Sequence, residues 1–93
     1  MTQQSALSYS VAQLASEIEL IDGALQLSDA NFRQQKLRIS ALPGETARTY
    51  AAHVLALGQK VAQRNMKAGV PLIAQLCVLA QMATECAAKK MKP

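Results

Sequence analysis

Two stretches decide the fold of this protein: residues 45–68, ETARTYAAHVLALGQKVAQRNMKA, and residues 71–90, PLIAQLCVLAQMATECAAKK. In both, apolar residues recur every three or four positions, as on one face of an α-helix. The first repeat comprises Tyr50, Val54, Leu57 and Val61, and the second comprises Leu72, Leu76, Leu79, Ala83 and Cys86. The pattern predicts two helices of about 35 and 30 Å that pair as an antiparallel hairpin.

Glycine and proline predict where these helices meet. Gly69 suits the position just past a helix end, and Pro71 suits the first position of the next helix. We therefore expect Gly69-Val70 to join the two helices. Gly58 lies in the interior of the first helix, where glycine costs about 1 kcal/mol relative to alanine. We attribute Gly58 to the close approach of a neighbouring helix.

The first third of the chain also has a helical pattern. Leu7, Val11, Leu14, Ile18, Ile21 and Leu25 are separated by steps of four and three, which is a heptad repeat. This pattern predicts a helix over about residues 5–27. Ser28 and Asp29 are good N-cap residues, so we expect a break there and a second helix over 29–41. The alternative is one continuous helix of about 54 Å, and no strand is predicted.

These elements define an all-α fold in a single domain, residues 1–93. The chain contains only three Pro and four Gly, and 51% of its residues are hydrophobic, which allows one packed core. The expected architecture is a small bundle of three to four helices, over about 5–27, 29–41, 45–68 and 71–90. The residues expected to be most buried are Leu14, Ile18, Ile21, Val54, Leu57, Leu76 and Leu79.

Composition also limits where the protein acts. The longest apolar run, Val70 to Ala83, is interrupted by Gln75 and Gln81, so no membrane-spanning helix and no membrane partner are expected. The N-terminal residues lack the positive charge of a secretory signal, which favours the cytoplasm. Cys77 and Cys86 are nine positions apart on one predicted helix, too far for a disulfide, and both are expected to be buried.

The sequence offers little for catalysis. It has one histidine, no cysteine–histidine cluster with metal-ligand spacing, and no glycine-rich phosphate loop. His53 lies at the edge of the Tyr50–Val54–Leu57 repeat, where we expect a half-buried packing role. No catalytic residue, metal or cofactor is therefore predicted.

Charge is distributed unevenly along the chain. Residues 1–32 contain four acidic residues and no basic one, whereas residues 33–93 contain all ten basic residues and two acidic ones. Lys60, Arg64 and Lys67 have the spacing of one helical stripe. The candidate partner-binding residues are Arg33, Lys36, Arg38, His53, Lys60, Arg64, Lys67, Lys89 and Lys90. Three interpretations remain open: a solvated face that offsets the acidic segment, a face for an acidic protein, and a phosphate-binding face.

The excess of apolar residues over what so small a core can bury favours a protein partner. The mean hydropathy of +0.07 is high for so short a chain, and the last helix is apolar over an arc too wide for two neighbours to cover. We therefore predict a small non-catalytic protein of the chaperone, immunity, inhibitor or adaptor type, which binds another protein. A homodimer is also expected, because a straight first helix would leave part of the Val11–Ile39 line uncovered. The alternative function is a nucleic-acid accessory factor.

Overall fold

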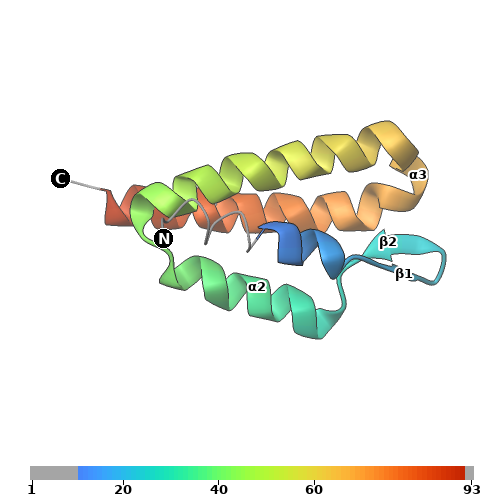
Figure 1. The fold of residues 1–93 in the computed structure, drawn as a ribbon, viewed down its shortest axis with the longest axis horizontal. Helices are drawn as coiled ribbons and strands as arrows, with labels where there is room; N and C mark the ends of the chain where they lie inside the picture. Colours follow the sequence, from blue (N-terminus) through green and yellow to red (C-terminus); the bar gives the residue numbers. More distant parts are fainter. Residues whose placement is uncertain (1–10, 92–93) are drawn as a thin grey trace.

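The structure, a computed structural model, describes residues 11–91 and is mostly helical with a small two-stranded sheet. A short helical segment over 11–16 is followed by β1 (Glu19–Ile21) and β2 (Ala24–Gln26). Helix α2 (Asp29–Ala41) and the very long helix α3 (Gly44–Lys90) complete the chain (Figure 1). The predominance of helix was expected. The sheet, and one folded helix in place of a bundle of three to four separate helices, were not.

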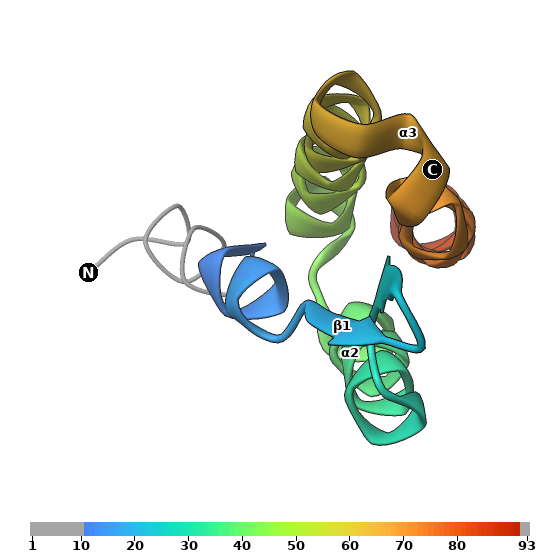
Figure 2. The ribbon, with the colours of Figure 1, turned by 90° about the vertical axis from the view of Figure 1, so that its right-hand side faces the viewer.

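Helix α3 doubles back on itself at Asn65, whose backbone leaves the helical region with φ −158° and ψ 82°. We call residues 44–64 the first arm and residues 66–90 the second arm; they run side by side in both ribbon views (Figures 1 and 2). As a result Gly44 lies against Met91, so that a Cβ on Gly44 would be 2.6 Å from Met91 Cγ. A straight helix would hold these two residues about 70 Å apart.

The reversal lies four residues before the predicted joint at Gly69-Val70. The Asn65 side-chain Oδ1 accepts a 3.2 Å hydrogen bond from the Ala68 N–H, which caps the start of the second arm. Gly69 is instead a buried residue inside the second arm, where a Cβ would lie 2.5 Å from Val61 Cγ1. Gly69 therefore lets the arms approach next to the reversal, and the predicted boundaries at 68 and 71 are wrong.

The β-hairpin replaces the second half of the predicted first helix. Its strands pair antiparallel in the register Glu19–Gln26, Leu20–Leu25 and Ile21–Ala24. Asp22 and Gly23 form the turn with φ of 54° and 80°, and Asp-Gly is favoured in two-residue hairpin turns because both residues tolerate positive φ. The helix therefore ends at residue 16 instead of 27; the predicted residues 5–10 lie outside the described part of the chain.

Helix α2 forms over the predicted range, 29–41. The hydroxyl of Ser28 accepts a 3.2 Å hydrogen bond from the Asn31 N–H, so Ser28 is the N-cap that the sequence indicated. The helix ends at Leu42, before Pro43, and Leu42 donates its N–H to the Ile39 carbonyl. Lys90 Nζ also donates to the Ser40 and Leu42 carbonyls, which ties this helix end to the end of α3.

A side-chain amide of α3 holds the hairpin in place. Leu27, directly after β2, donates its N–H to Gln75 Oε1 at 2.8 Å, and Gln75 Nε2 donates to the Leu27 carbonyl at 3.1 Å. Gln75 thus satisfies both backbone groups of a residue whose side chain is fully buried. This pair of bonds fixes β2 against the second arm.

The core lies between α3, α2 and the hairpin. Leu14, Val54, Leu76 and Leu79 are buried as predicted, whereas Ile18, Ile21 and Leu57 are only half-buried. The hairpin accounts for the change at Ile18 and Ile21, since a strand exposes one face where the predicted helix would have turned both residues inward. Large buried residues outside the predicted set are Leu27, Ile39, Tyr50 and Leu72.

Two glycines of α3 should respond to alanine in opposite directions. A Cβ on Gly69 collides with Val61, so we expect Gly69→Ala to lower the free energy of unfolding by about 1–3 kcal/mol. A Cβ on Gly58 meets only Leu76 Cδ1 at 3.7 Å, an ordinary contact, so close packing does not explain this glycine. Gly58→Ala should raise the free energy of unfolding by about 0.5–1 kcal/mol. Urea unfolding below about 1 µM, where the chain is monomeric and the surface at Gly58 is open, measures both; two changes of the same sign would contradict this packing.

The two hydrogen bonds of Gln75 should contribute more to the free energy of unfolding than the side chain of an exposed glutamine does. We expect Gln75→Ala to lower the free energy of unfolding by about 1–3 kcal/mol, because both backbone groups of Leu27 lose their partner. Gln63→Ala is the matched control, since Gln63 is exposed on the first arm and undergoes the same change in helix propensity. Equal unfolding midpoints in urea for the two variants would show that the hairpin does not depend on this amide.

Candidate functional site

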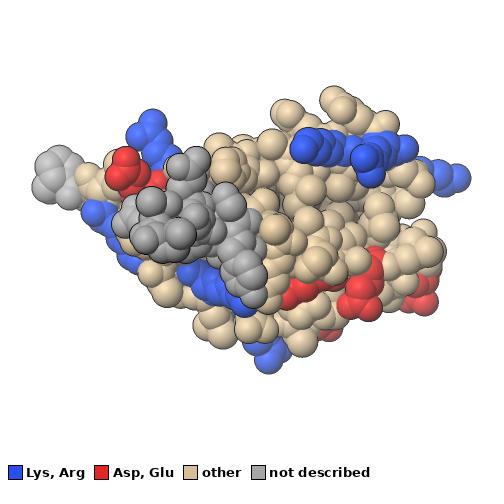
Figure 3. All heavy atoms as spheres, viewed as in Figure 1, with Lys and Arg blue, Asp and Glu red and all other residues tan. Residues whose placement is uncertain are grey.

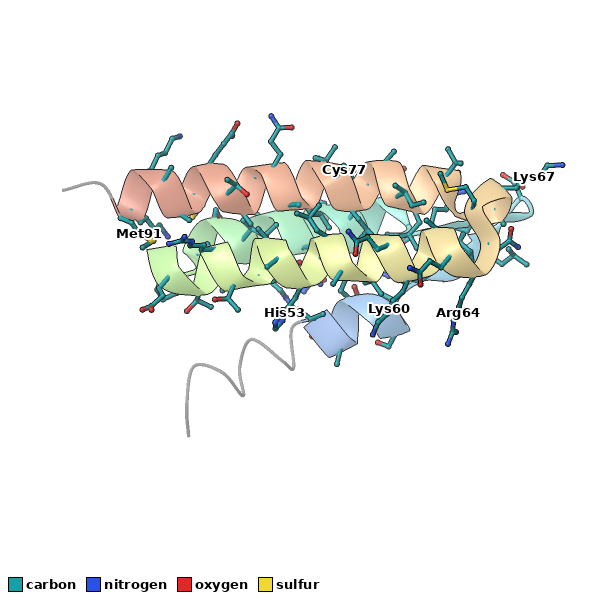
Figure 4. All side chains as sticks on the ribbon, turned by 90° about the horizontal axis from the view of Figure 1, so that it is seen from above. His53, Lys60, Arg64, Lys67, Cys77 and Met91 are labelled. Atoms are coloured by element: carbon teal, nitrogen blue, oxygen red, sulfur yellow. The ribbon has the colours of Figure 1, made fainter. Side chains whose placement is uncertain are left out.

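Three of the predicted partner-binding residues lie together on one flank of the first arm. His53, Lys60 and Arg64 are exposed, and Figure 4 shows all three side chains pointing to the same side of α3. Lys67 is also exposed, but it follows the reversal, and its side chain points outward beyond that end of the molecule. The expected stripe therefore loses Lys67 and keeps His53, whose predicted half-buried packing role is wrong.

The other predicted residues are dispersed. Arg38 is half-buried and donates from Nη1 to Gln13 Oε1 at 2.6 Å, and Lys90 is bonded to the end of α2. The Lys36 ammonium lies 4.4 Å from the centre of the Phe32 ring, a cation–π contact. Arg33 and Lys89 are exposed, on α2 and near the end of the second arm. These five residues do not join the flank that carries Lys60.

Apolar residues accompany the bases on this flank. Leu57 and Val61 are half-buried, pack against the core, and fall between His53 and Arg64 at helical spacing. We call His53, Leu57, Lys60, Val61 and Arg64 the mixed stripe. It spans about 16 Å of helix and combines positive charge with an apolar floor.

The acidic residues do not cover the mixed stripe in the surface view. Figure 3 shows acidic atoms at the lower right, by the hairpin and the start of α2, with a further group at the upper left; basic atoms lie at the upper right, by the reversal of α3, and also on the left and lower sides. Glu19, Asp22 and Asp29 are all exposed. The acidic residues of the first third of the chain thus gather around the hairpin and the start of α2, whereas basic residues are spread over several parts of the surface.

A buried polar cluster joins the N-terminal helical segment, α2 and α3. The Tyr50 hydroxyl donates to Gln35 Oε1 at 2.7 Å, and both residues are fully buried. The pKa of Tyr50 is raised to about 12, mainly because burial disfavours the charged phenolate; the nearby Arg38 lowers the pKa and Glu17 raises it. Gln35 is a position where the heptad repeat fails, and no local pattern indicates that its amide meets Tyr50. The cluster fixes α2 against the first arm.

A second surface feature lies between the two arms, on the flank opposite the mixed stripe. One hollow of about 280 Å³ is lined mainly by apolar residues of both arms, among them Leu55, Gly58, Ala62, Ile73 and Cys77. A second hollow, of about 310 Å³, is lined by Arg48, Thr84, Ala87, Ala88 and Met91. We call this face, with both hollows, the inter-arm seam.

The two cysteines are free thiols in different surroundings. Cys77 is exposed at the inter-arm seam, so its predicted burial is wrong. Cys86 is half-buried, with Sγ 3.5 Å from the Ile39 carbonyl oxygen. Within residues 11–91, no group of three His, Cys, Asp or Glu side chains is placed to hold a metal ion.

Helix α3 is long and apolar enough to cross a membrane by length and composition alone. Its most apolar 18-residue window has a mean hydropathy of 1.4, and only 33% of that window is buried within the molecule. Much of an unusually apolar segment is therefore exposed, which in proteins commonly marks an interaction surface.

No protein-family model matches this chain, and no curated protein or solved structure is detectably similar to it. Function is therefore inferred from the mixed stripe and the inter-arm seam.

The buried hydroxyl of Tyr50 should make the fold sensitive to alkali. The unfolded tyrosine ionises near pH 10 and the folded one near 12, so the unfolded state loses its proton first. The contribution of Tyr50 to stability is fully present below pH 10 and falls by about 2–3 kcal/mol between pH 10 and 12. Tyr50→Phe should be less stable at pH 7, by about 1–3 kcal/mol, since Gln35 loses its donor.

Urea unfolding of both proteins at pH 7, 10 and 12 tests this. The stability difference between wild type and Tyr50→Phe should shrink as the pH rises through that window. A difference that stays constant would mean that Tyr50 ionises at an ordinary pKa.

Proposed function

We propose that this protein is a non-catalytic module that binds another protein through the mixed stripe. The ligand is a protein segment in which Asp or Glu residues alternate with apolar ones. The observation that carries this proposal is the exposure of His53, Lys60 and Arg64 beside the half-buried Leu57 and Val61. Carboxylates would pair with the two permanent charges, and apolar side chains would cover the floor between them.

The alternative ligand is a nucleic acid, and the stripe suits it less well. Proteins that bind single strands stack bases on exposed aromatic rings; of the aromatic residues within 11–91, Tyr50 is fully buried and Phe32 is half-buried beneath Lys36. Duplex binding without sequence preference relies on many phosphate contacts, and the stripe supplies two permanent charges. An apolar floor between the bases adds nothing to a phosphate contact and favours a protein segment.

In this proposal the protein belongs with small chaperones, immunity proteins, inhibitors or adaptors, and it needs no cofactor. We propose the cytoplasm as its location. The exposed thiol of Cys77 supports this, because a free surface cysteine persists most readily in a reducing compartment. Such modules act by occupying or presenting a partner, so affinity is the quantity to measure.

Neutralising the two permanent charges of the mixed stripe should weaken the binding of an acidic peptide. The probe is a fluorescein-labelled 14-residue peptide with repeating Glu-Glu-Leu units, and anisotropy at about 50 mM salt measures its affinity. Lys60→Gln/Arg64→Gln should lose roughly three- to tenfold in affinity, the effect of two exposed ion pairs. Arg33→Gln/Lys89→Gln changes net charge equally, lies off the stripe, and should lose less than twofold.

Equal losses in the two double variants would contradict the proposal, because only net charge would then matter. A single-stranded DNA of about 11 nucleotides, whose roughly ten phosphates match the charge of the peptide, is the second probe. If DNA binds more tightly than the peptide, and its affinity falls steeply between about 50 and 200 mM salt, the phosphate-binding alternative holds instead.

A further inference from the structure

The inter-arm seam carries little charge in a charged molecule: of the residues that line its two hollows, Arg48 alone is charged. Residues 68–84, which form most of the second arm, contain no Asp, Glu, Lys or Arg. On the first arm, Lys60 and Arg64 point to the opposite flank, and Arg48 lies only at the open end of the seam. Two large side chains that line the seam are substantially exposed: Leu55 at 50% and Met66 at 57%.

The rest of the fold leaves this face open. Figure 2 shows α2 and the β-hairpin together on one side of the two arms of α3. Gln75 holds the hairpin there through Leu27, and Tyr50 holds α2 there through Gln35. The residues described between 11 and 43 are thus committed to the core side and do not cover the seam.

We propose that a second copy of this chain covers the inter-arm seam, forming a dimer about a two-fold axis. A two-fold axis brings residues of one patch next to the same residues of the partner, so a charge near the axis would meet its like. Each chain has a formal net charge of +4, and a face whose single charged lining residue, Arg48, lies at the open end keeps that repulsion away from the hollow beside Leu55. The hollow beside Leu55 has no charged lining residue with which to select an acidic or basic partner.

The size of the seam fits a stable dimer. The second arm is about 37 Å long, and two helices packed about 9 Å apart present a face about 20 Å wide. The face therefore covers roughly 700 Å² per copy, close to the roughly 800 Å² that each partner contributes to a typical stable interface. The long dimension of the molecule, 44 Å, accommodates this length.

The shape of the seam also suits pairing with itself. Leu55 projects from the first arm, while the hollow next to it is floored by Gly58 and Ala62, where side chains are absent or small. A two-fold axis through this region allows Leu55 of each copy to enter the hollow of the other. Such reciprocal insertion of an apolar side chain buries the surface that a monomer would expose.

This interface differs from the dimer that the sequence suggested through the Val11–Ile39 line. That line does not exist as a helical face, because β1 and β2 interrupt it and Leu25 is half-buried against the core. The seam instead includes the broad apolar face of the last helix, the feature of the sequence that favours a protein partner. The mixed stripe lies on the other flank, so the dimer is independent of the proposed function and leaves both stripes exposed.

Sedimentation equilibrium of the full chain between 1 and about 100 µM tests the dimer. We expect the wild type to have twice the 10.0 kDa chain mass at the upper concentrations. Leu55→Glu should be a 10 kDa monomer with an unchanged circular-dichroism spectrum, with the dimer dissociation constant raised at least 100-fold. Leu37→Glu is the matched control, since Leu37 is 66% exposed on α2, and it should remain dimeric.

Two further variants make the outcome of this experiment unambiguous. Met66→Glu repeats it at a second exposed position of the seam, should Leu55→Glu fail to fold. Lys60→Gln/Arg64→Gln should remain dimeric, which separates failure of the dimer from failure of the mixed stripe. A wild type that stays monomeric at 100 µM, or a dimer lost in Leu37→Glu but kept in Leu55→Glu, would overturn the inference. So would a monomer that floats with phosphatidylcholine vesicles and ceases to do so in Leu55→Glu.

Discussion

The reversal of α3 at Asn65 is the constraint on which the other features of this molecule depend. The Asn65 side chain caps the second arm, and Gly69 allows Val61 to approach within a distance that no Cβ would permit. The arms then meet along their length, from Gly69 beside the reversal to Gly44 against Met91 at the open end. Because the first arm is covered on its core side, it keeps two exposed flanks, one with the mixed stripe and one with the inter-arm seam.

Two amide contacts place the rest of the chain on the core side of α3. Gln75 supplies both hydrogen-bonding groups to Leu27, and Gln35 accepts from the buried hydroxyl of Tyr50. These hydrogen bonds favour one arrangement, since any other would leave the Leu27 backbone groups and the Tyr50 hydroxyl without partners, although the buried Gln35 Nε2 itself has no partner among the described residues. The hairpin and α2 therefore occupy one side of the arms, and the apolar surplus of the sequence is left on the other.

The sequence predicted the parts of this fold that depend on helical spacing. Helix α2 with its Ser28 cap, and the burial of Leu14, Val54, Leu76 and Leu79, follow from periodicity and capping alone. The hairpin was not predicted, because Ile18, Ile21 and Leu25 continue a heptad repeat that indicates a helix. The opposing signal, the Asp22-Gly23 turn, consists of only two residues. The predicted joint at Gly69-Val70 lies four residues after the observed reversal at Asn65, because Gly69 and Pro71 resemble a helix end more strongly than Asn65 does. That displacement also removed Lys67 from the stripe. The hydrogen bonds of Gln35 and Gln75 could not be predicted from the sequence, since their partners are distant along the chain.

The reversal is tested most directly by nuclear Overhauser effects in a sample of isotope-labelled chains diluted into unlabelled ones, which reports contacts within one chain. The structure predicts effects between the Gly58 α-protons and the Leu76 δ-methyl groups, and between the Gly69 α-protons and the Val61 γ-methyl groups. It also predicts that the helical connectivities between residues three apart are interrupted at Asn65. Unbroken helical connectivities from residue 61 to 69, without the two inter-arm contacts, would contradict the fold and both surfaces derived from it.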